Sequence, residues 1–429
     1  MLNFFTNLIP FVTANAILIP EKLPGPLFTR IENFWSISTL CSFVKSKTAN
    51  DKDSYLIILV CNFFKKNLLL IFNAIVSSLP VQLIIKQSLI IFLLFLVSSS
   101  QLLLSQDNIE DKGIIVLMYH RFEENKYPST NIKIANFIEH LNLIKNKQFE
   151  FVDPTSFEKS LLNKKKKRKI LLTIDDGFKS FYEKAWPILK KEKIPFILFV
   201  NTREIGTKGY MSWEQIKQVS REKFAHIGNH SYSHEYLIDM KDQEIIDDID
   251  IASNDFKNNL GYNSPFFSYP FGEYSNNFKA IIKDLGFKYA FGQHSGVADE
   301  TKDFYELPRF PINEAYGELK RFETILKTIP FKFKSIMPEE KYIKDSNNPP
   351  QVIVEFFENI KNIKLLNCYS NELNSWRKSE LDFINHYKVK INLIGKFTTE
   401  RGRINCSLRE DDGSWRWLGM QFVVADIKN

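Results

Sequence analysis

Two short segments carry side chains that could bind a metal ion and activate water. In the first, the apolar run Leu171–Ile174 is followed by Asp175, Asp176 and a glycine, so both carboxylates come at the tip of a predicted strand. In the second, His230 and His234 are four residues apart and can turn their imidazoles toward one point. One aspartate and two histidines make a three-ligand metal set with open positions, and the other aspartate is left as a general base. This combination is typical of metal-assisted hydrolysis.

Together with a third segment, these motifs resemble those of a known enzyme family. The sequences TIDDG at 173–177, HSYSH at 230–234 and FSYPFG at 267–272 occur in that order. They resemble the motifs of the polysaccharide deacetylases of carbohydrate esterase family 4, also called the NodB-homology domain. The resemblance covers residues 112 to 330, about half of the chain. It implies an enzyme that removes acetyl groups from a polysaccharide.

The resemblance also implies a role for each motif residue. Asp176, His230 and His234 would hold a divalent cation, for which zinc is the expected ion. Asp175 would take the proton from the attacking water. The oxyanion would be stabilised by the metal and by backbone N–H groups of the third motif. The residues around that oxyanion and substrate position are Tyr269, Pro270, Phe271 and Gly272.

Two further roles have candidates away from these motifs. Most of the family protonates the leaving amine with a histidine of a late Leu-x-x-His motif, which this sequence lacks. The chain is similar instead to the circularly permuted subgroup that includes poly-N-acetylglucosamine deacetylases, which use an early Tyr-His. Tyr119-His120 matches that pattern, so we predict His120 as the general acid, with His294 as the rival. Arg309 is either a support for the base or a surface ion-pair residue.

The amino-terminal 105 residues contain a predicted export signal. Lys86 precedes an apolar core, Leu89–Val97, and small residues follow, which is the pattern of a secretory signal peptide. Residues 81–105 are therefore a signal peptide or, alternatively, an uncleaved membrane anchor. Residues 1–80 are either a membrane-associated extension or the result of a start assigned too early, with Val81 as the natural start. Both interpretations predict an exported protein of the periplasm or cell envelope, and an uncleaved anchor would attach it to the inner membrane.

Between residues 112 and 335, predicted strands and helices alternate with short loops. Helices are predicted at 134–147, 186–193, 213–221, 242–259 and 278–285, and strands at 113–119, 149–153, 195–200, 266–269 and 287–291. Such alternation is typical of an α/β fold with parallel strands. The family resemblance sharpens this prediction to a distorted (β/α)7 barrel, in which chemistry is located at strand ends.

A linker at 336–350 and a small all-β, sandwich-like domain at 351–429 are predicted to follow. The domain is predicted from six short alternating segments at 352–356, 363–369, 387–394, 403–408, 414–418 and 421–425. Cys368 and Cys406 lie in two of them and form either a disulfide or two buried thiols. Trp415 and Trp417 would share a strand face, where they either pack in the core or stack on sugar rings.

Charge and composition limit the possible partners. The net charge of +7 is spread thinly over 429 residues, and its one dense run, Lys164–Lys169, is interpreted as a solvated loop. We therefore predict no nucleic-acid partner and membrane contact only through the N-terminal segment. The sequence predicts an exported, metal-dependent hydrolase that removes N-acetyl groups from a polysaccharide containing N-acetylglucosamine. An O-acetyl esterase acting on an acetylated glycan and a catalytically silent glycan-binding protein are the alternatives.

Overall fold

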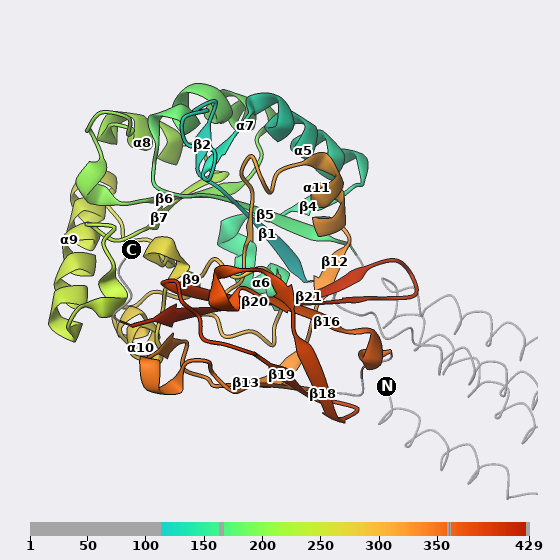
Figure 1. The fold of residues 1–429 in the computed structure, drawn as a ribbon. Helices are drawn as coiled ribbons and strands as arrows, with labels where there is room; N and C mark the ends of the chain where they lie inside the picture. The colour runs from blue at the N-terminus through green and yellow to red at the C-terminus, as the bar shows by residue number, and fades with distance from the viewer. Residues whose placement is uncertain (1–112, 163–166, 358–359, 361, 426–429) are drawn as a thin grey trace, which may run out of the picture. The chain divides into compact units, whose positions relative to one another are not determined.

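The computed structural model describes residues 113–162, 167–357, 360 and 362–425 (Figure 1). The predicted signal segment and the extension before it lie outside these residues. The described residues belong to one unit, Asn108–Asn429. In the described part of the chain, no helix is both long enough and apolar enough to cross a membrane.

Residues 114–311 of the described chain contain the strands of a nine-stranded, mainly parallel sheet. Its parallel strands, in spatial order, are β1 (Ile114–Tyr119), β5 (Lys169–Ile174), β6 (Phe196–Val200), β7 (Ala225–Asn229), β8 (Phe266–Ser268) and β9 (Tyr289–Phe291). β10 (Val297–Ala298) and β11 (Phe310–Pro311) pair with β1, and β4 (Glu150–Phe151) pairs with β5. The predicted α/β class is confirmed. A closed barrel of seven strands stays a prediction.

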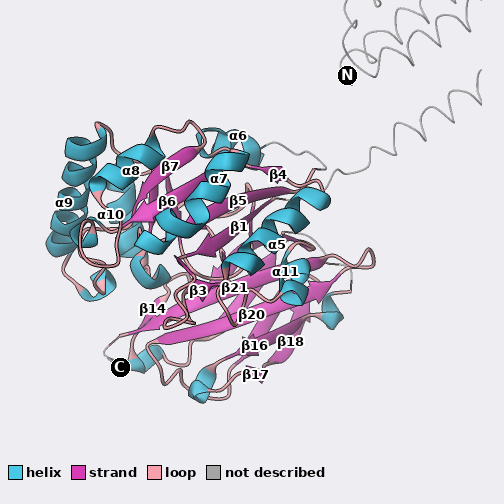
Figure 2. Ribbon diagram, turned by 90° about the horizontal axis from the view of Figure 1, so that it is seen from above, coloured by secondary structure: helices cyan, strands magenta, loops and turns pink. Residues whose placement is uncertain are grey.

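Helices cover the outer side of this sheet (Figures 1 and 2). They are α5 (Ile134–Asn146), α6 (Phe157–Leu162), α7 (Trp186–Glu192), α8 (Trp213–Ser220), α9 (Asp242–Leu260), α10 (Asn276–Asp284) and α11 (Leu319–Ile325). Because both faces of the sheet are covered, every residue of β5 and β6 is buried, and the sequence of β6 is a continuous apolar run. Gly228 in β7 allows close packing, since a Cβ there would lie 2.3 Å from the ring of Phe199.

Residues 328–424 form two smaller sheets that share one hydrophobic core. The six-stranded sheet contains β12 (Thr328–Pro330), β14 (Tyr342–Ile343), β16 (Asn367–Ser370), β17 (Arg377–Lys378), β20 (Arg401–Arg409) and β21 (Trp415–Val424). The four-stranded sheet contains β13 (Phe333–Met337), β15 (Val352–Phe356), β18 (Glu380–Asn385) and β19 (Lys388–Asn392). The sandwich-like description of this part stays a prediction.

The segment predicted as a linker and the two cysteines both lie within these sheets. The segment 336–350, predicted as a linker, holds the end of β13 and all of β14, which pair with β15 and β21. Cys368 of β16 and Cys406 of β20 lie opposite each other and form a disulfide. The structure therefore has the disulfide rather than the two buried thiols.

A short parallel pair, β2 (Arg121–Phe122) and β3 (Asn131–Ile132), follows β1.

Candidate active site

The predicted site residues share one edge of the large sheet, where its parallel strands end. They are His120 after β1, Asp175 and Asp176 after β5, His230 and His234 after β7, Tyr269–Gly272 after β8, and His294 after β9. Arg309 directly precedes β11, which lies beside β1. The topology thus brings together residues that are far apart in the sequence.

Asp176, His230 and His234 meet at one point. Oδ1 of Asp176 lies 3.4 Å from Nε2 of His230 and 3.4 Å from Nε2 of His234. One ligand atom from each of the three residues lies within 4.8 Å of the others. Within the described chain, Oδ1 of Asp176 and Nε2 of His230 are buried without a hydrogen-bond partner, as expected of atoms that bind a metal. Imidazole nitrogens and a carboxylate oxygen are ligands that suit Zn²⁺, so these residues fit a divalent cation.

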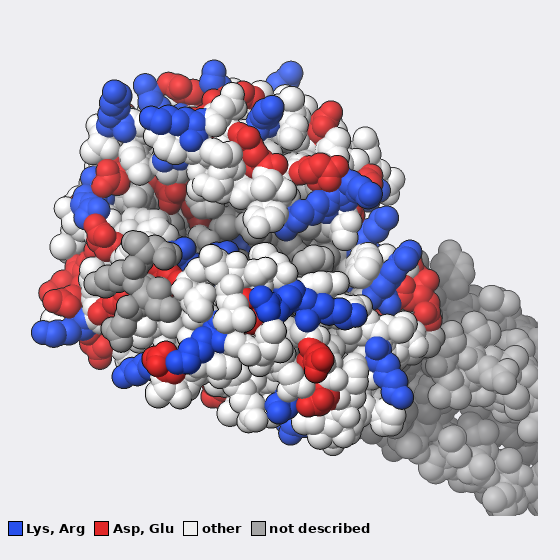
Figure 3. Space-filling model, in the orientation of Figure 1, with Lys and Arg blue, Asp and Glu red and all other residues white. Residues whose placement is uncertain are grey.

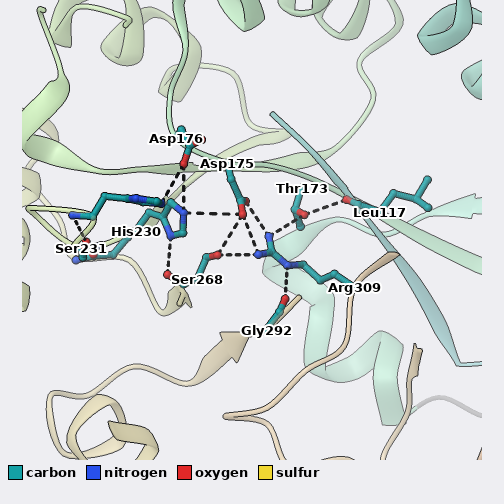
Figure 4. A network of polar contacts seen from close by, with 11 residues as sticks. Leu117, Thr173, Asp175, Asp176, His230, Ser231, Ser268, Gly292 and Arg309 are labelled. Carbon is teal, nitrogen blue, oxygen red and sulfur yellow. Dashed lines mark hydrogen bonds and ion pairs between the residues drawn. The ribbon is translucent and has the colours of Figure 1, made fainter. Parts of the chain in front are cut away.

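The surroundings favour the metal-binding forms of Asp176 and His234. The carbonyl of Ser268 lies 2.6 Å from Nδ1 of His230, which leaves Nε2 facing Asp176 (Figure 4). Burial, together with the nearby His230, lowers the pKa of His234 to about 4. Burial raises the pKa of Asp176, but the polar contact with His230 and the charges of the neighbouring imidazoles outweigh it and lower that pKa overall. An ionised carboxylate and a neutral His234 imidazole are therefore present at neutral pH.

Asp175 is held by an arginine from another strand. Nη1 and Nη2 of Arg309 donate to the two oxygens of Asp175 at 2.7 and 2.8 Å, and both side chains are fully buried (Figure 4). Burial raises the pKa of Asp175, but the charge of Arg309 and its hydrogen bonds outweigh this and lower it overall. Of the two interpretations of Arg309, the structure has the support for Asp175 rather than a surface ion pair.

Sequence reasoning missed two residues of this network. The hydroxyl of Ser268 donates to Oδ2 of Asp175 at 3.3 Å and accepts from Nη2 of Arg309 at 2.8 Å. The hydroxyl of Thr173 accepts from Nη1 of Arg309 at 3.2 Å. Thr173 lies two positions before Asp175 along the chain. Because side chains two residues apart in a strand point to the same face, the sequence could have indicated that Thr173 lies beside Asp175. Ser268 lies within the third motif, but nothing in the motif indicated a contact with Asp175 or Arg309.

The turn that carries the two histidines is itself held by an acidic side chain. The carboxylate of Asp248 on α9 accepts from the backbone N–H groups of Tyr232 and Ser233 at 2.8 and 3.0 Å. Ser231 and His234 have positive φ angles of 69° and 53°. Such conformations in residues other than glycine cost about 1–3 kcal/mol and persist where the surroundings fix them, often at functional sites.

In the third motif, the backbone N–H groups have different partners. The N–H of Tyr269 donates to the carbonyl of Phe291 at 3.1 Å, and that of Gly272 donates to the carbonyl of Tyr269 at 2.9 Å. Pro270 has no N–H group. Among the described residues, no backbone carbonyl accepts a hydrogen bond from the N–H of Phe271. Its φ angle is 58°, and its ring contacts His234 edge-on at 4.6 Å between ring centroids.

A cavity of about 780 Å³ opens at these residues. Asp176, His234 and Phe271 line it on the side of the large sheet, and Arg403 and Gln421 line it on the side of the six-stranded sheet. Figure 3 shows a hollow between the upper part of the molecule, where the large sheet and its helices lie, and the lower part, where β20 and β21 lie. The volume is within the range of about 300–1,000 Å³ that is usual for ligand sites.

The candidates for the general acid both line this cavity but lie in different electrostatic surroundings. Burial lowers the pKa of His120, and the charges of Asp176 and Asp175 oppose that effect. Burial lowers the pKa of His294 to about 4, and the strongest charge acting on it is that of Glu306. The hydroxyl of Tyr274 lies 3.4 Å from Nδ1 of His294. His120 is thus the histidine that interacts with the carboxylates of Asp175 and Asp176.

Residues 162–290 match the family model described as polysaccharide deacetylase. The chain carries a polysaccharide deacetylase domain. The poly-beta-1,6-N-acetyl-D-glucosamine N-deacetylase of Staphylococcus aureus is 23% identical over 245 residues, which are 50% of this chain and 84% of that protein. The solved structure of IcaB from Ammonifex degensii is 26% identical and has a TM-score of 0.47, over 51% of this chain and 98% of that one. The deacetylase PplD of Streptococcus pyogenes, solved in complex with acetate, is 22% identical with a TM-score of 0.46, over 50% and 98% of the chains.

Strand β21 contacts the third motif of the deacetylase domain directly. Nε2 of Gln421 donates to the carbonyls of Phe271 and Gly272 at 3.3 and 3.2 Å. Trp417 packs edge-on against Phe310 at 5.9 Å between ring centroids, and it also lines the cavity. The carbonyl of Ser295 accepts from the N–H of Gly419 at 2.6 Å.

The neighbouring strand β20 contacts the same loop of the deacetylase domain. Nε of Arg401 donates to the carboxylate of Glu273 at 2.6 Å, and its guanidinium lies 5.2 Å from the ring centroid of Phe271. Glu273 is the residue after the third motif and is almost fully buried. The C-terminal strands therefore form one wall of the deacetylase cavity. Nothing in the sequence marked Arg401 or Gln421 as part of the site.

Proposed function

We propose that this chain is a metal-dependent hydrolase that removes N-acetyl groups from a polysaccharide containing N-acetylglucosamine. The observation that carries the proposal is the pair of neighbouring carboxylates with different partners. Asp176 faces two histidines, whereas Asp175 is bound by Arg309. One carboxylate is thus available as a metal ligand and the other as a base. The named N-deacetylase relative from Staphylococcus aureus supports the choice of an N-acetylglucosamine polymer.

Asp176, His230 and His234 would hold the metal, for which zinc is the expected ion. A bound divalent cation supplies Lewis-acid polarisation of the acetyl carbonyl and lowers the pKa of water. Asp175 accepts the proton of the attacking water at a carboxylate oxygen. Arg309 keeps this carboxylate ionised and fixes its orientation, so the base needs no rearrangement before it acts.

Two further groups would complete the reaction. The N–H of Phe271 donates to the oxyanion that develops on the acetyl carbon, because the other amides of that loop donate to carbonyls of the fold. His120 then gives a proton to the leaving amine, so that the C–N bond breaks with a neutral amine as the leaving group. We also propose that the deacetylase domain is a distorted (β/α)7 barrel. The chain is proposed to be exported across the inner membrane.

The test is acetate release by the purified full chain from β-1,6-linked N-acetylglucosamine oligomers. The protein is assayed with zinc, after removal of metal by a chelator, and after zinc is added back. The proposal predicts release that is lost on chelation and restored by zinc. A parallel assay uses an O-acetylated glycan.

Each alternative predicts a different pattern. Release from the O-acetylated glycan alone would show the site to be an esterase and would overturn the N-deacetylase proposal. Zinc binding without acetate from either substrate would indicate the silent glycan-binding protein. Release that is unaffected by chelation would contradict metal dependence.

A further inference from the structure

Three exposed aromatic side chains line the same cavity as the catalytic residues. Tyr316, Tyr369 and Trp376 are 44%, 46% and 50% exposed, and all three line this one cavity. Tyr369 and Trp376 belong to the C-terminal part, and Tyr316 faces the cavity from the deacetylase domain. Exposed aromatic rings that gather in one cavity are a feature of ligand sites, because their apolar faces can pack on a partner.

Strand register places Tyr369 on the wall that faces the catalytic residues. Tyr369 of β16 pairs with Asn405 of β20, which in turn pairs with Gly419 of β21. Side chains of directly opposed residues point to the same face of a sheet, so Tyr369 shares the face of Asn405. Adjacent strands lie about 4.8 Å apart, which puts β16 about 10 Å farther out than β21. β21 contacts the loop that contains Phe271, at the proposed acetyl position. The cavity wall formed by β21, β20 and β16 therefore extends about two strands beyond that position.

The same face carries polar groups with spare hydrogen-bonding capacity. Arg401, Arg403 and Asn405 alternate with buried residues along β20 and line the cavity. Arg403 uses Nε to bind Gln421 at 3.3 Å, and a guanidinium has further N–H donors. Across the cavity, the guanidinium of Arg321 lies 4.9 Å from the ring centroid of Tyr316. Aromatic faces beside planar hydrogen-bond donors suit a pyranose ring, which has an apolar C–H face and a rim of hydroxyls.

We infer that the C-terminal sheet holds a distal sugar subsite, built by Trp376, Tyr369 and Arg403. A sugar ring packs on Trp376 and Tyr369 while Arg403 donates to its hydroxyl or acetamido oxygens. The substrate is then a glycan chain that reaches from the deacetylase centre to β16 and β17, rather than a single sugar or a dimer. This inference rests on the proposed function, since it names the length of glycan that the same site takes.

The test measures binding separately from turnover. The full chain, stripped of metal with a chelator so that it cannot turn over substrate, is titrated with a dimer and with a hexamer of β-1,6-linked N-acetylglucosamine by calorimetry. The variants are Trp376→Ala, Trp376→Phe and Tyr369→Ala. Tyr387→Ala is the matched control, because Tyr387 is a C-terminal aromatic residue that is 42% exposed and does not line the cavity.

The inference predicts that the hexamer binds at least about tenfold more tightly than the dimer, as expected for one added group of contacts. Trp376→Ala and Tyr369→Ala remove most of that difference, and leave the affinity for the dimer unchanged. Trp376→Phe keeps an aromatic face and should therefore retain much of the difference in affinity between hexamer and dimer. Tyr387→Ala should leave this difference unchanged. Equal affinities for dimer and hexamer, or a Trp376→Ala variant that binds the hexamer like the wild type, would overturn the inference.

Failure of the inference can be distinguished from failure of the proposed function. If the zinc-loaded chain releases no acetate but the hexamer affinity still depends on Trp376, the subsite stands and the deacetylase proposal fails. If acetate is released from dimer and hexamer with the same KM, and Trp376→Ala changes neither value, the deacetylase proposal stands and the subsite fails. Trp376 is half exposed, so its substitution leaves the hydrophobic cores intact.

Discussion

Arg309 and Asp175 are 134 residues apart in the chain, yet they meet in a buried ion pair with two hydrogen bonds of 2.7 and 2.8 Å. The pair gives Asp175 a fixed orientation and keeps it ionised, whereas its neighbour Asp176 faces two histidines. Two adjacent carboxylates therefore have different partners because different elements reach them, and the proposed function gives them different roles. This division of roles is the basis of the predictions below.

Replacing Arg309 should reduce both stability and activity. Arg309→Met leaves Asp175 buried without its partner, which typically costs about 3–5 kcal/mol in the free energy of unfolding. Arg309→Lys keeps the charge but loses the two-pronged geometry, so its effect should be intermediate. Urea unfolding and acetate release measure the two effects. Arg203→Met is the control, since Arg203 forms a largely exposed ion pair with Glu235 and should contribute less than about 1 kcal/mol. An Arg309→Met variant as stable and active as Arg203→Met would refute the assigned role.

The general acid can be identified by varying the leaving group. His120→Asn should lower acetate release from an N-acetyl substrate by about 10²–10⁴-fold, the usual contribution of a general acid. Hydrolysis of a phenyl acetate with a nitro-substituted ring should fall much less, because that leaving group departs without a proton. His294→Asn is the matched comparison and should leave the ratio of the two rates unchanged. If His294→Asn rather than His120→Asn changes this ratio, the acid has been assigned to the wrong histidine.

Glu273 should make stability depend on pH. Burial raises the pKa of Glu273 to about 7, and this effect exceeds the opposing charge of Arg401. The folded chain therefore binds this proton more tightly than the unfolded chain does, so stability falls as pH rises from about 4.5 to about 7 and then levels off. The loss is at most about 3 kcal/mol, since one pKa unit corresponds to about 1.4 kcal/mol.

Urea unfolding of wild type and Glu273→Gln across this pH range measures that contribution. The stability of the wild type relative to Glu273→Gln should decrease as pH rises, because the glutamine does not titrate. Glu139→Gln on the exposed side of α5 controls for the loss of a carboxylate elsewhere. Parallel pH curves for wild type and Glu273→Gln would show that Glu273 titrates normally.

Local patterns were sufficient to predict much of the fold. The buried runs of β5 and β6 and the alternation of β15 mark strands, because their side chains match a sheet buried on two faces or on one. The segments 414–418 and 421–425 were predicted as separate strands, but they form the single strand β21. Gly419 lies between them because a Cβ there would be 2.5 Å from the carbonyl of Ser295, and not because the strand ends. The predicted strand at 363–369 begins later, since Ile363–Leu365 forms a 3₁₀ turn.

The candidate site was predictable where its residues lie within motifs and not where contacts are long-range. Asp175 and His230 each follow a strand with a recognisable pattern, so their approximate positions followed from the sequence. The pairing of Gln421 with the loop at Phe271 depends on how two sheets pack, which no local pattern encodes. The same holds for Tyr369 and Trp376, whose place in the cavity depends on strand register.

The most direct test of the account compares zinc content and acetate release in wild type and Asp175→Asn. Asp175 does not belong to the three-residue cluster, so the variant should still bind one zinc ion per chain with unchanged affinity. Its acetate release from N-acetylglucosamine oligomers should fall by about 10²–10⁴-fold, because the base is lost. Retained activity would show that Asp175 is not the base. Loss of zinc together with activity would show that the two aspartates do not have the separate roles assigned to them.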